Sequence, residues 1–326
     1  MITDFAYVSA NSLKDAVKQL SSPGARVHAG GTDLLSCLRD EIFVADKIVS
    51  LTRLDSLRGI GETPDGGVRI GALTTIAEVA LHPLVKDRYT ALSQAASAVG
   101  SPQLRNQGTI GGNICQKPRC WYYRGEFHCL RKGGDLCYAA SGQNQFHAIM
   151  GSDNLCYIVH PSDTAPALIA LAAKVRVVGP SESKLVPLEK FFVSPGVSLQ
   201  TETVLKKDEI VTEILLPKVA AGTWSSYRKV RARRSWDFAL AGVALVILLK
   251  EGTVADARVV LSGAAPVPWR SREAEEKLRG RKIDEQVAAS AGAAAMQKAD
   301  PLEHNQYKVP LFQSLLEEQI LQTSRS

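Results

Sequence analysis

Five of the six cysteines fall in one segment of the chain, at Cys115, Cys120, Cys129, Cys137 and Cys156. Their successive spacings are C-x4-C, C-x8-C, C-x7-C and C-x18-C, and none is the C-x2-C pair typical of structural zinc. Arginine, lysine and histidine residues surround the middle three, whereas Cys37 sits in an apolar stretch. Nearby cations favour the thiolate, which is the form that binds metals. The residues alone leave three possibilities open: reduced thiols in a polar loop, a zinc site with His128 as a ligand, or an iron–sulfur cluster.

Two short glycine-pair segments precede or border these cysteines. They comprise Ala29, Gly30, Gly31, Thr32, Asp33 and Leu34, and then Thr109, Ile110, Gly111, Gly112 and Asn113. Paired glycines let backbone amides approach a phosphate without hindrance from Cβ. The side chains of Thr32 and Asn113 can add hydrogen bonds, and Asp33 can accept one from a ribose-type hydroxyl. Neither segment matches GxGxxG or GxxxxGK[ST], so a simple turn and a phosphate-binding turn both remain open.

The elements that position these residues can be read from hydrophobic periodicity. Apolar residues at helical spacing predict a helix over 13–20, with Ser12 as its N-cap. The segment 25–40 predicts a strand, a glycine turn and a helix. The segment 68–81 predicts a strand that runs into a helix capped by Thr74 or Thr75. After the cysteines, 156–160 predicts a strand.

The pattern changes near residue 220. Two long apolar strands within 237–266 predict a β-hairpin that turns at Glu251 and Gly252, and 308–321 predicts an amphipathic closing helix. We therefore expect an α+β fold with two domains, one over 1–220 and a smaller one over 221–326.

Composition narrows the class of protein. The 326 residues are 45% hydrophobic and 22% charged, with a formal net charge of +6. The one dense basic run is short and leads into an apolar strand, which argues against nucleic-acid binding. No apolar run approaches the roughly 18 residues of a membrane span. The first twenty residues lack the basic and apolar regions of a signal peptide, so we expect a cytoplasmic protein, although export with a partner remains open.

Several motifs together resemble one known family. The segments AGGTDLL, IGALTTIAEV, GTIGGNI, HPSDTAPALIAL, TEILLP and HNQYKVPL are similar, in order and spacing, to the FAD-binding subunit of molybdenum-containing hydroxylases. That family includes xanthine dehydrogenase, carbon monoxide dehydrogenase and aldehyde oxidoreductases. The resemblance covers nearly the whole chain. It implies a vanillyl-alcohol-oxidase-type FAD-binding domain followed by a C-terminal α+β domain of the molybdenum-hydroxylase flavoprotein type.

The resemblance also implies roles for individual residues. Both glycine turns would wrap the FAD pyrophosphate, and Asp163 would hold the ribityl or phosphate region. Leu215 would pack near the flavin ring, and Lys229 would lie near its polar edge. Without the resemblance, Asp163 would be interpreted as a helix N-cap and Lys229 as a solvated lysine. No residue of the chain is expected to be catalytic, because the cofactors carry the chemistry.

The cysteine segment, at about 115–156, resembles an insertion found in 4-hydroxybenzoyl-CoA reductase and certain aldehyde oxidoreductases, where it carries a [4Fe–4S] cluster. The resemblance aligns Cys120, Cys129 and Cys137 with three ligands. The fourth cysteine of the benzoyl-CoA pattern falls on Phe146, which cannot ligate. The aldehyde-oxidoreductase pattern matches Cys156 instead. We favour Cys156 over Cys115 because it closes the insertion from both ends.

The resemblance therefore implies an electron-transfer flavoprotein in a heterotrimeric oxidoreductase. A large partner would hold molybdopterin, a small partner would hold [2Fe–2S] clusters, and electrons would pass through FAD to an external acceptor. The cysteine pattern favours an aldehyde oxidoreductase. A subunit of a hydroxybenzoyl-CoA reductase or xanthine dehydrogenase-like enzyme, and a self-contained flavin oxidase, are the alternatives.

Overall fold

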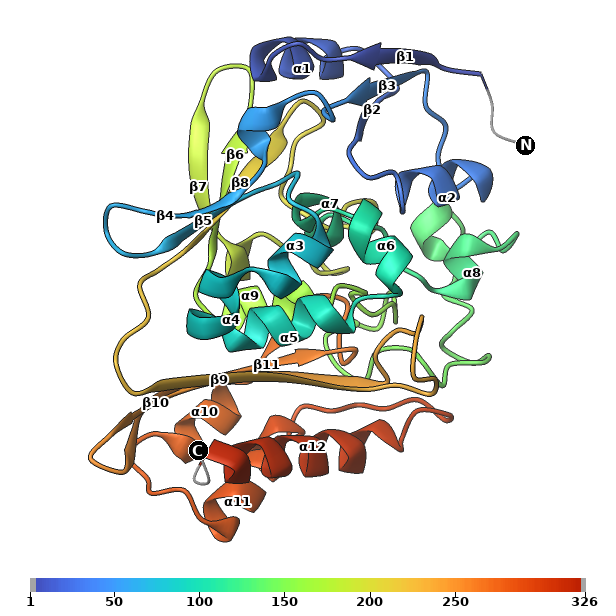
Figure 1. Cartoon of the computed structure of the whole chain (residues 1–326). Coiled ribbons are helices and arrows are strands. Elements are labelled where there is room, and N and C mark those ends of the chain that lie inside the picture. Colours follow the sequence, from blue (N-terminus) through green and yellow to red (C-terminus); the bar gives the residue numbers. More distant parts are fainter. Residues whose placement is uncertain (1–3, 324–326) are drawn as a thin grey trace.

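The computed structural model describes residues 4–323, which form three β-sheets with helices between and beside them (Figure 1). The first sheet is parallel, in the order β1–β3–β2, and comprises β1 (Ala6–Ser9), β3 (Lys47–Ser50) and β2 (Ala25–His28). Helices α1 (Leu13–Leu20) and α2 (Leu34–Arg39) accompany it. The predicted first helix is confirmed, because Ser12 Oγ accepts the backbone N–H of Asp15 at its start.

The second sheet is antiparallel and has the order β4–β5–β8–β6–β7. Its strands are β4 (Ile60–Glu62), β5 (Val68–Gly71), β6 (Lys174–Val178), β7 (Ser183–Pro187) and β8 (Ile210–Leu216). The helices between β5 and β6 are α3 (Ile76–Leu81), α4 (Pro83–Arg88), α5 (Thr90–Ala98), α6 (Pro102–Gln107), α7 (Ile110–Ile114), α8 (Trp121–Arg124) and α9 (Thr164–Ala170). Short 3-10 turns lie at η1 (Asp55–Leu57), η2 (Leu130–Lys132) and η3 (Leu188–Lys190). Thr75 caps α3 through a complete capping box, as its sequence predicts.

The third sheet, in the order β12–β11–β10–β9, lies between two layers of helices (Figure 1). It comprises β9 (Thr223–Val230), β10 (Ala241–Lys250), β11 (Thr253–Ser262) and β12 (Trp269–Arg270), and the chain ends in α10 (Arg272–Leu278), α11 (Glu285–Ala295) and α12 (Lys308–Thr323). Alternate residues of β10 face opposite layers: Ala244 joins the core of the first domain, whereas Val243 and Leu245 join the core beneath α12. Burial on both faces explains the continuous apolar sequence of this strand.

The predicted hairpin and the predicted closing helix are confirmed, whereas the strand predicted over 156–160 is wrong. Lys250 pairs with Thr253, so Glu251 and Gly252 form the hairpin turn, both at positive φ. The closing helix is present as α12. Residues 156–160 are not a strand, because only isolated backbone bonds hold them: the N–H of Ala148 donates to Tyr157 and the N–H of His160 donates to Ala265.

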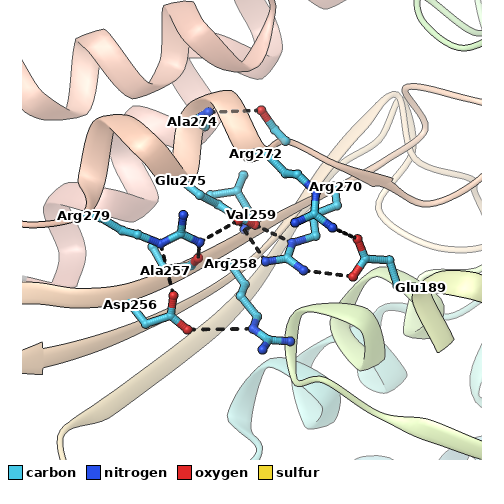
Figure 2. A network of polar contacts seen from close by, with 11 residues as sticks. Glu189, Asp256, Ala257, Arg258, Val259, Arg270, Arg272, Ala274, Glu275 and Arg279 are labelled. Atoms are coloured by element: carbon cyan, nitrogen blue, oxygen red, sulfur yellow. Dashed lines mark hydrogen bonds and ion pairs between the residues drawn. The ribbon is translucent and has the colours of Figure 1, made fainter. Parts of the chain in front are cut away.

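A network of ion pairs joins the two domains (Figure 2). The carboxylate of Glu275, on α10, is fully buried and accepts two hydrogen bonds from Arg270, at 2.7 and 2.9 Å. Arg270 also donates to Glu189 of the first domain at 2.9 Å. Arg279 and the backbone N–H of Val259 complete the partners of Glu275, at 3.0 and 3.1 Å. A buried charge satisfied in this way fixes the orientation of α10 on the sheet.

The first turn of α12 holds the end of the cysteine segment. The fully buried Lys308 ammonium donates to the carbonyls of His147 and Gly263, each at 2.9 Å, and to that of Phe146 at 3.2 Å. The Asn305 amide donates to three carbonyls of the same segment, those of Asn144, His147 and Ala148. Residues from the far end of the sequence thus fix the path of residues 144–148. Within the described residues, no helix is long and apolar enough to cross a membrane.

Burial lowers the pKa of Lys308 to about 7, which predicts a pH effect on stability. Between about pH 7 and the ordinary lysine value near 10.5, the folded chain loses a proton that the unfolded chain keeps. Lys308 should therefore contribute a rise of about 2 kcal/mol to the free energy of unfolding from pH 7 to pH 9. Urea unfolding of the wild type at both values checks this. The change in the free energy of unfolding between the two pH values should be about 2 kcal/mol less positive in Lys308→Met than in the wild type, and unaltered in a variant of the exposed Lys277; an equal change in Lys308→Met would contradict the assignment.

Candidate functional site

A cavity of about 600 Å³ lies where the two predicted glycine turns meet. The predicted site residues that line it are Ala29, Gly30, Gly31, Thr32, Asp33, Leu34, Thr109, Gly111, Gly112, Asn113, Asp163 and Lys229. The structure does not bring Leu215 to the cavity. That residue lies further along β8, where it pairs with Arg69 and Lys174, and Ile210 and Val211 of the same strand line the cavity instead.

The two turns touch one another through their backbones. A Cβ atom on Gly30 would lie 2.0 Å from the carbonyl oxygen of Gln107, directly before the second turn. Gly31 has a φ of +74°, which favours glycine. In the second turn, Thr109 Oγ1 accepts the N–H of Gly112 at 3.2 Å. The absence of a side chain on Gly30 is therefore needed for the two turns to meet.

Asn113 ties the second turn to the segment that precedes α9. Its Oδ1 accepts hydrogen bonds from the hydroxyls of Ser162, at 2.6 Å, and Thr164, at 2.7 Å. Ser162 Oγ also accepts the N–H of Ala165, at 3.0 Å, and so caps the helix. Asp163 makes no such cap bond. Its carboxylate instead bonds Tyr227 and Lys229 at the wall of the cavity, which disagrees with its interpretation as a simple N-cap.

Asp163 and Lys229 form a buried ion pair at the cavity wall. Lys229 Nζ lies 2.7 Å from one carboxylate oxygen of Asp163, and the hydroxyl of Tyr227 donates to the other at 2.7 Å. Lys229 also donates to the carbonyl of Ala98 at 3.2 Å. Burial raises the pKa of Asp163, and the charge of Lys229 opposes that shift. Lys229 is therefore an internal residue, in contrast to the solvated lysine that its basic neighbours in the sequence suggest.

A second, smaller cavity lies inside the cysteine segment. All four predicted ligands line it, namely Cys120, Cys129, Cys137 and Cys156, and Cys115 lines the larger cavity instead. His147 also lines it, with Nε2 at 3.2 Å from Cys120 Sγ. His128 does not, and Phe146 is half exposed against the ring of Trp121. Among residues 4–323, no three His, Cys, Asp or Glu side chains already stand as a metal-binding group.

The thiols of this cavity differ in acidity. A hydrogen bond from Cys156 lowers the pKa of Cys137 to about 6, and the same bond raises the pKa of Cys156. Burial raises the pKa of Cys120 to about 11. The hydrogen-bonded thiols lie too close to one another to be spread around a cluster. Four soft sulfur donors in the lining of one cavity nevertheless suit iron–sulfur chemistry.

Comparisons with known proteins identify the family of this chain and the cofactor that the family binds. Residues 3–219 match the family described as the FAD binding domain in molybdopterin dehydrogenase. Residues 225–323 match the CO dehydrogenase flavoprotein C-terminal domain. The chain belongs to the FAD-binding subunits of the molybdenum hydroxylases. The expected α+β architecture, an FAD-binding domain followed by a flavoprotein C-terminal domain, is therefore confirmed, and the chain is an oxidoreductase subunit.

Individual relatives of this flavoprotein subunit align over nearly their whole length. The aldehyde oxidoreductase FAD-binding subunit PaoB of Escherichia coli is 34% identical over 316 residues, which cover 96% of both chains. The glyceraldehyde dehydrogenase medium chain of Sulfolobus acidocaldarius is 31% identical over 91% of this chain and 89% of its own length. Carbon monoxide dehydrogenase of Hydrogenophaga pseudoflava superimposes with a TM-score of 0.78, at 27% identity, over 98% of this chain and 96% of its own.

The larger cavity fits FAD in the chemistry of its lining. Two arginines there, Arg26 and Arg119, keep a buried Nε–H without any hydrogen-bond partner in the described chain. Such unpaired donors suit an anionic ligand. The guanidinium of Arg26 also stacks on the ring of Phe43, at 4.7 Å, beside the cavity. FAD bound there would supply a carrier for two electrons, and the groups of this chain that would hold it are the guanidinium groups, the two glycine turns and the Asp163–Lys229 pair that line the cavity.

The sequence did not point to several of these residues. Arg26 lies in a strand, Phe43 lies in an irregular segment and Tyr227 lies in a basic-looking strand, and none belongs to a motif. Asp33, in contrast, was expected to accept a hydrogen bond from a ribose-type hydroxyl, but donors from the protein occupy its carboxylate. Its carboxylate accepts from the backbone N–H of Lys117 at 2.7 Å and from the guanidinium groups of Arg124 and Arg119, at 2.8 and 2.9 Å.

Proposed function

We propose that this chain is the electron-transfer flavoprotein of a heterotrimeric aldehyde oxidoreductase. A large partner would hold molybdopterin and a small partner [2Fe–2S] clusters, and electrons would leave through FAD for an external acceptor. The domain division near residue 220, with FAD on the first domain, belongs to the same proposal. The relative that supports an aldehyde as the substrate is the 34%-identical aldehyde oxidoreductase subunit.

The convergence of four cysteines on one cavity carries the finer part of the proposal, a [4Fe–4S] cluster held by Cys120, Cys129, Cys137 and Cys156. Thiolates are the usual ligands of such clusters. The lining also contains a cation, Arg131, which favours the negatively charged thiolate form. Zinc with His128 is less well supported, because that histidine does not line the cavity.

Oxidation of an aldehyde to a carboxylic acid adds an oxygen from water and releases two electrons and two protons. That chemistry needs a group that activates water beside the aldehyde, which we assign to the molybdenum partner. In the larger cavity of this chain, Asp163 and Lys229 are paired with one another, and the free Nε–H groups of Arg26 and Arg119 suit an anion. The chain would therefore receive electrons and would not itself bind the aldehyde productively.

The chain purified alone and loaded with FAD should show no aldehyde-dependent loss of flavin absorbance. Adding the two partner subunits should restore rapid loss of that absorbance under anaerobic conditions. Dithionite, which reduces the flavin chemically, serves as the positive control for the isolated chain. Reduction by aldehyde without partners or molybdenum would instead identify a self-contained flavin oxidase, and reduction of the whole complex by xanthine but not by aldehydes would favour the xanthine dehydrogenase alternative.

A further inference from the structure

Two carboxylates join the cysteine segment to the larger cavity. One is Asp33, which accepts from three groups of residues 117–124 at the entry to the cysteine segment. The other is Glu202, which lies far away in the sequence and belongs to no recognised motif. The N–H of Val193 donates to the Glu202 carbonyl at 3.0 Å and fixes its backbone to the first domain.

Glu202 contacts the linings of both cavities at once. One of its carboxylate oxygens binds Lys117 Nζ, and the other binds Arg131 Nη2. Lys117 lines the larger cavity, and Arg131 lines the cysteine cavity, where its guanidinium also lies over the ring of Tyr123. The Arg131 side chain is 3% exposed and that of Glu202 is 10% exposed. An ion pair that is this well shielded from water is coupled far more strongly than one on the surface.

We propose that Glu202 is a positioning residue that couples the two sites, so that a filled cysteine cavity strengthens FAD binding. The inference rests on the proposed function, since it takes a cluster as one ligand and FAD as the other. A cluster held by four thiolates carries net negative charge and attracts Arg131. It also orders the segment that presents Lys117 to the larger cavity. FAD binding then costs less conformational entropy.

The measurement is the FAD dissociation constant of the full-length chain, obtained by flavin fluorescence during titration of the FAD-free protein. It is made on cluster-loaded protein and on protein from which iron has been removed by chelation. The iron-depleted wild type should bind FAD at least about fivefold more weakly, which is the low end of ordinary coupling between sites. In Glu202→Gln the ratio of the two constants should fall to about one.

Glu213 offers a matched control. Its carboxylate also lies between two cations, Arg69 at 2.5 Å and Arg176 at 2.6 Å, and is 14% exposed, but it lines neither cavity. Glu213→Gln should therefore keep the wild-type ratio. If Glu202→Gln fails to fold, Lys117→Met breaks the same link at its more exposed end, where the side chain is 27% exposed, and leaves Arg131 paired. In that variant the ratio of the two FAD dissociation constants should also fall to about one.

The outcomes separate this inference from the proposed function. A wild-type chain that binds both iron and FAD, with equal FAD affinity in the loaded and depleted forms, overturns the coupling alone. A wild-type ratio that persists in both Glu202→Gln and Lys117→Met overturns the role of Glu202. A chain that never takes up iron overturns the proposed cluster, and the coupling with it.

Discussion

Replacing Gly30 by valine is expected to lower FAD affinity by about tenfold or more, while the chain still folds. The added Cβ would lie 2.0 Å from the carbonyl oxygen of Gln107, and backbone cannot yield as a flexible side chain can. The first turn must therefore move away from the second, and the part of the cavity that the two turns line changes shape. Flavin content after gel filtration and the FAD dissociation constant measure the effect.

Two further variants calibrate that result. In Gly111→Val the new Cβ would lie 2.9 Å from the Cβ of Ala72, so FAD retention should also fall, though less steeply. Gly61, in β4, has no atom within 4 Å of an added Cβ, so Gly61→Val makes the same change in open space and should retain FAD. Full flavin occupancy in both Gly30→Val and Gly111→Val would show that these turns do not hold the cofactor.

Serine in place of any one of Cys120, Cys129, Cys137 or Cys156 is expected to remove most of the iron. A serine oxygen is a poor substitute for thiolate, and a cluster with three remaining thiolates is readily lost. Cys115→Ala should keep the iron, because that thiol lines the other cavity. Iron and acid-labile sulfide per chain, together with the low-temperature EPR signal of the reduced protein, are the measurements.

The pattern of losses also identifies the fourth ligand. Iron lost from Cys115→Ala and kept in Cys156→Ser would assign Cys115. Iron kept in both would mean that a group other than cysteine completes the site. His147 is then the residue to change, because its Nε2 lies 3.2 Å from Cys120 Sγ, whereas His128 does not line the cavity.

Local sequence signals predicted the elements that depend on local interactions. The glycine pairs marked both turns because a turn free of Cβ atoms depends on those residues themselves. The hairpin at Glu251 and the helix capped by Thr75 follow from turn and cap chemistry in the same way. The strand expected over 156–160 was wrong, because its apolar residues are buried in an irregular segment held by separate partners.

The remaining site residues depend on contacts between distant parts of the chain. Tyr227 reaches Asp163 across 64 positions, and Glu202 reaches Arg131 across 71. No periodicity or spacing in one sequence encodes such a pairing. The proposed cluster ligands are an intermediate case: their residue type is visible in the sequence, but their choice among five cysteines comes from the family resemblance.

The hydrogen bonds from Asn305 and Lys308 to residues 144–148 determine when, during synthesis of the chain, the cysteine cavity can become complete. His147, whose carbonyl both residues bind, lines the cysteine cavity. A nascent chain exposes all of its cysteines long before residues 305–308 leave the ribosome, so during that interval the cavity lacks one fixed wall. Stable loading of the proposed cluster would therefore follow translation, and a chain that ends before Asn305 would leave the cysteine segment without this contact.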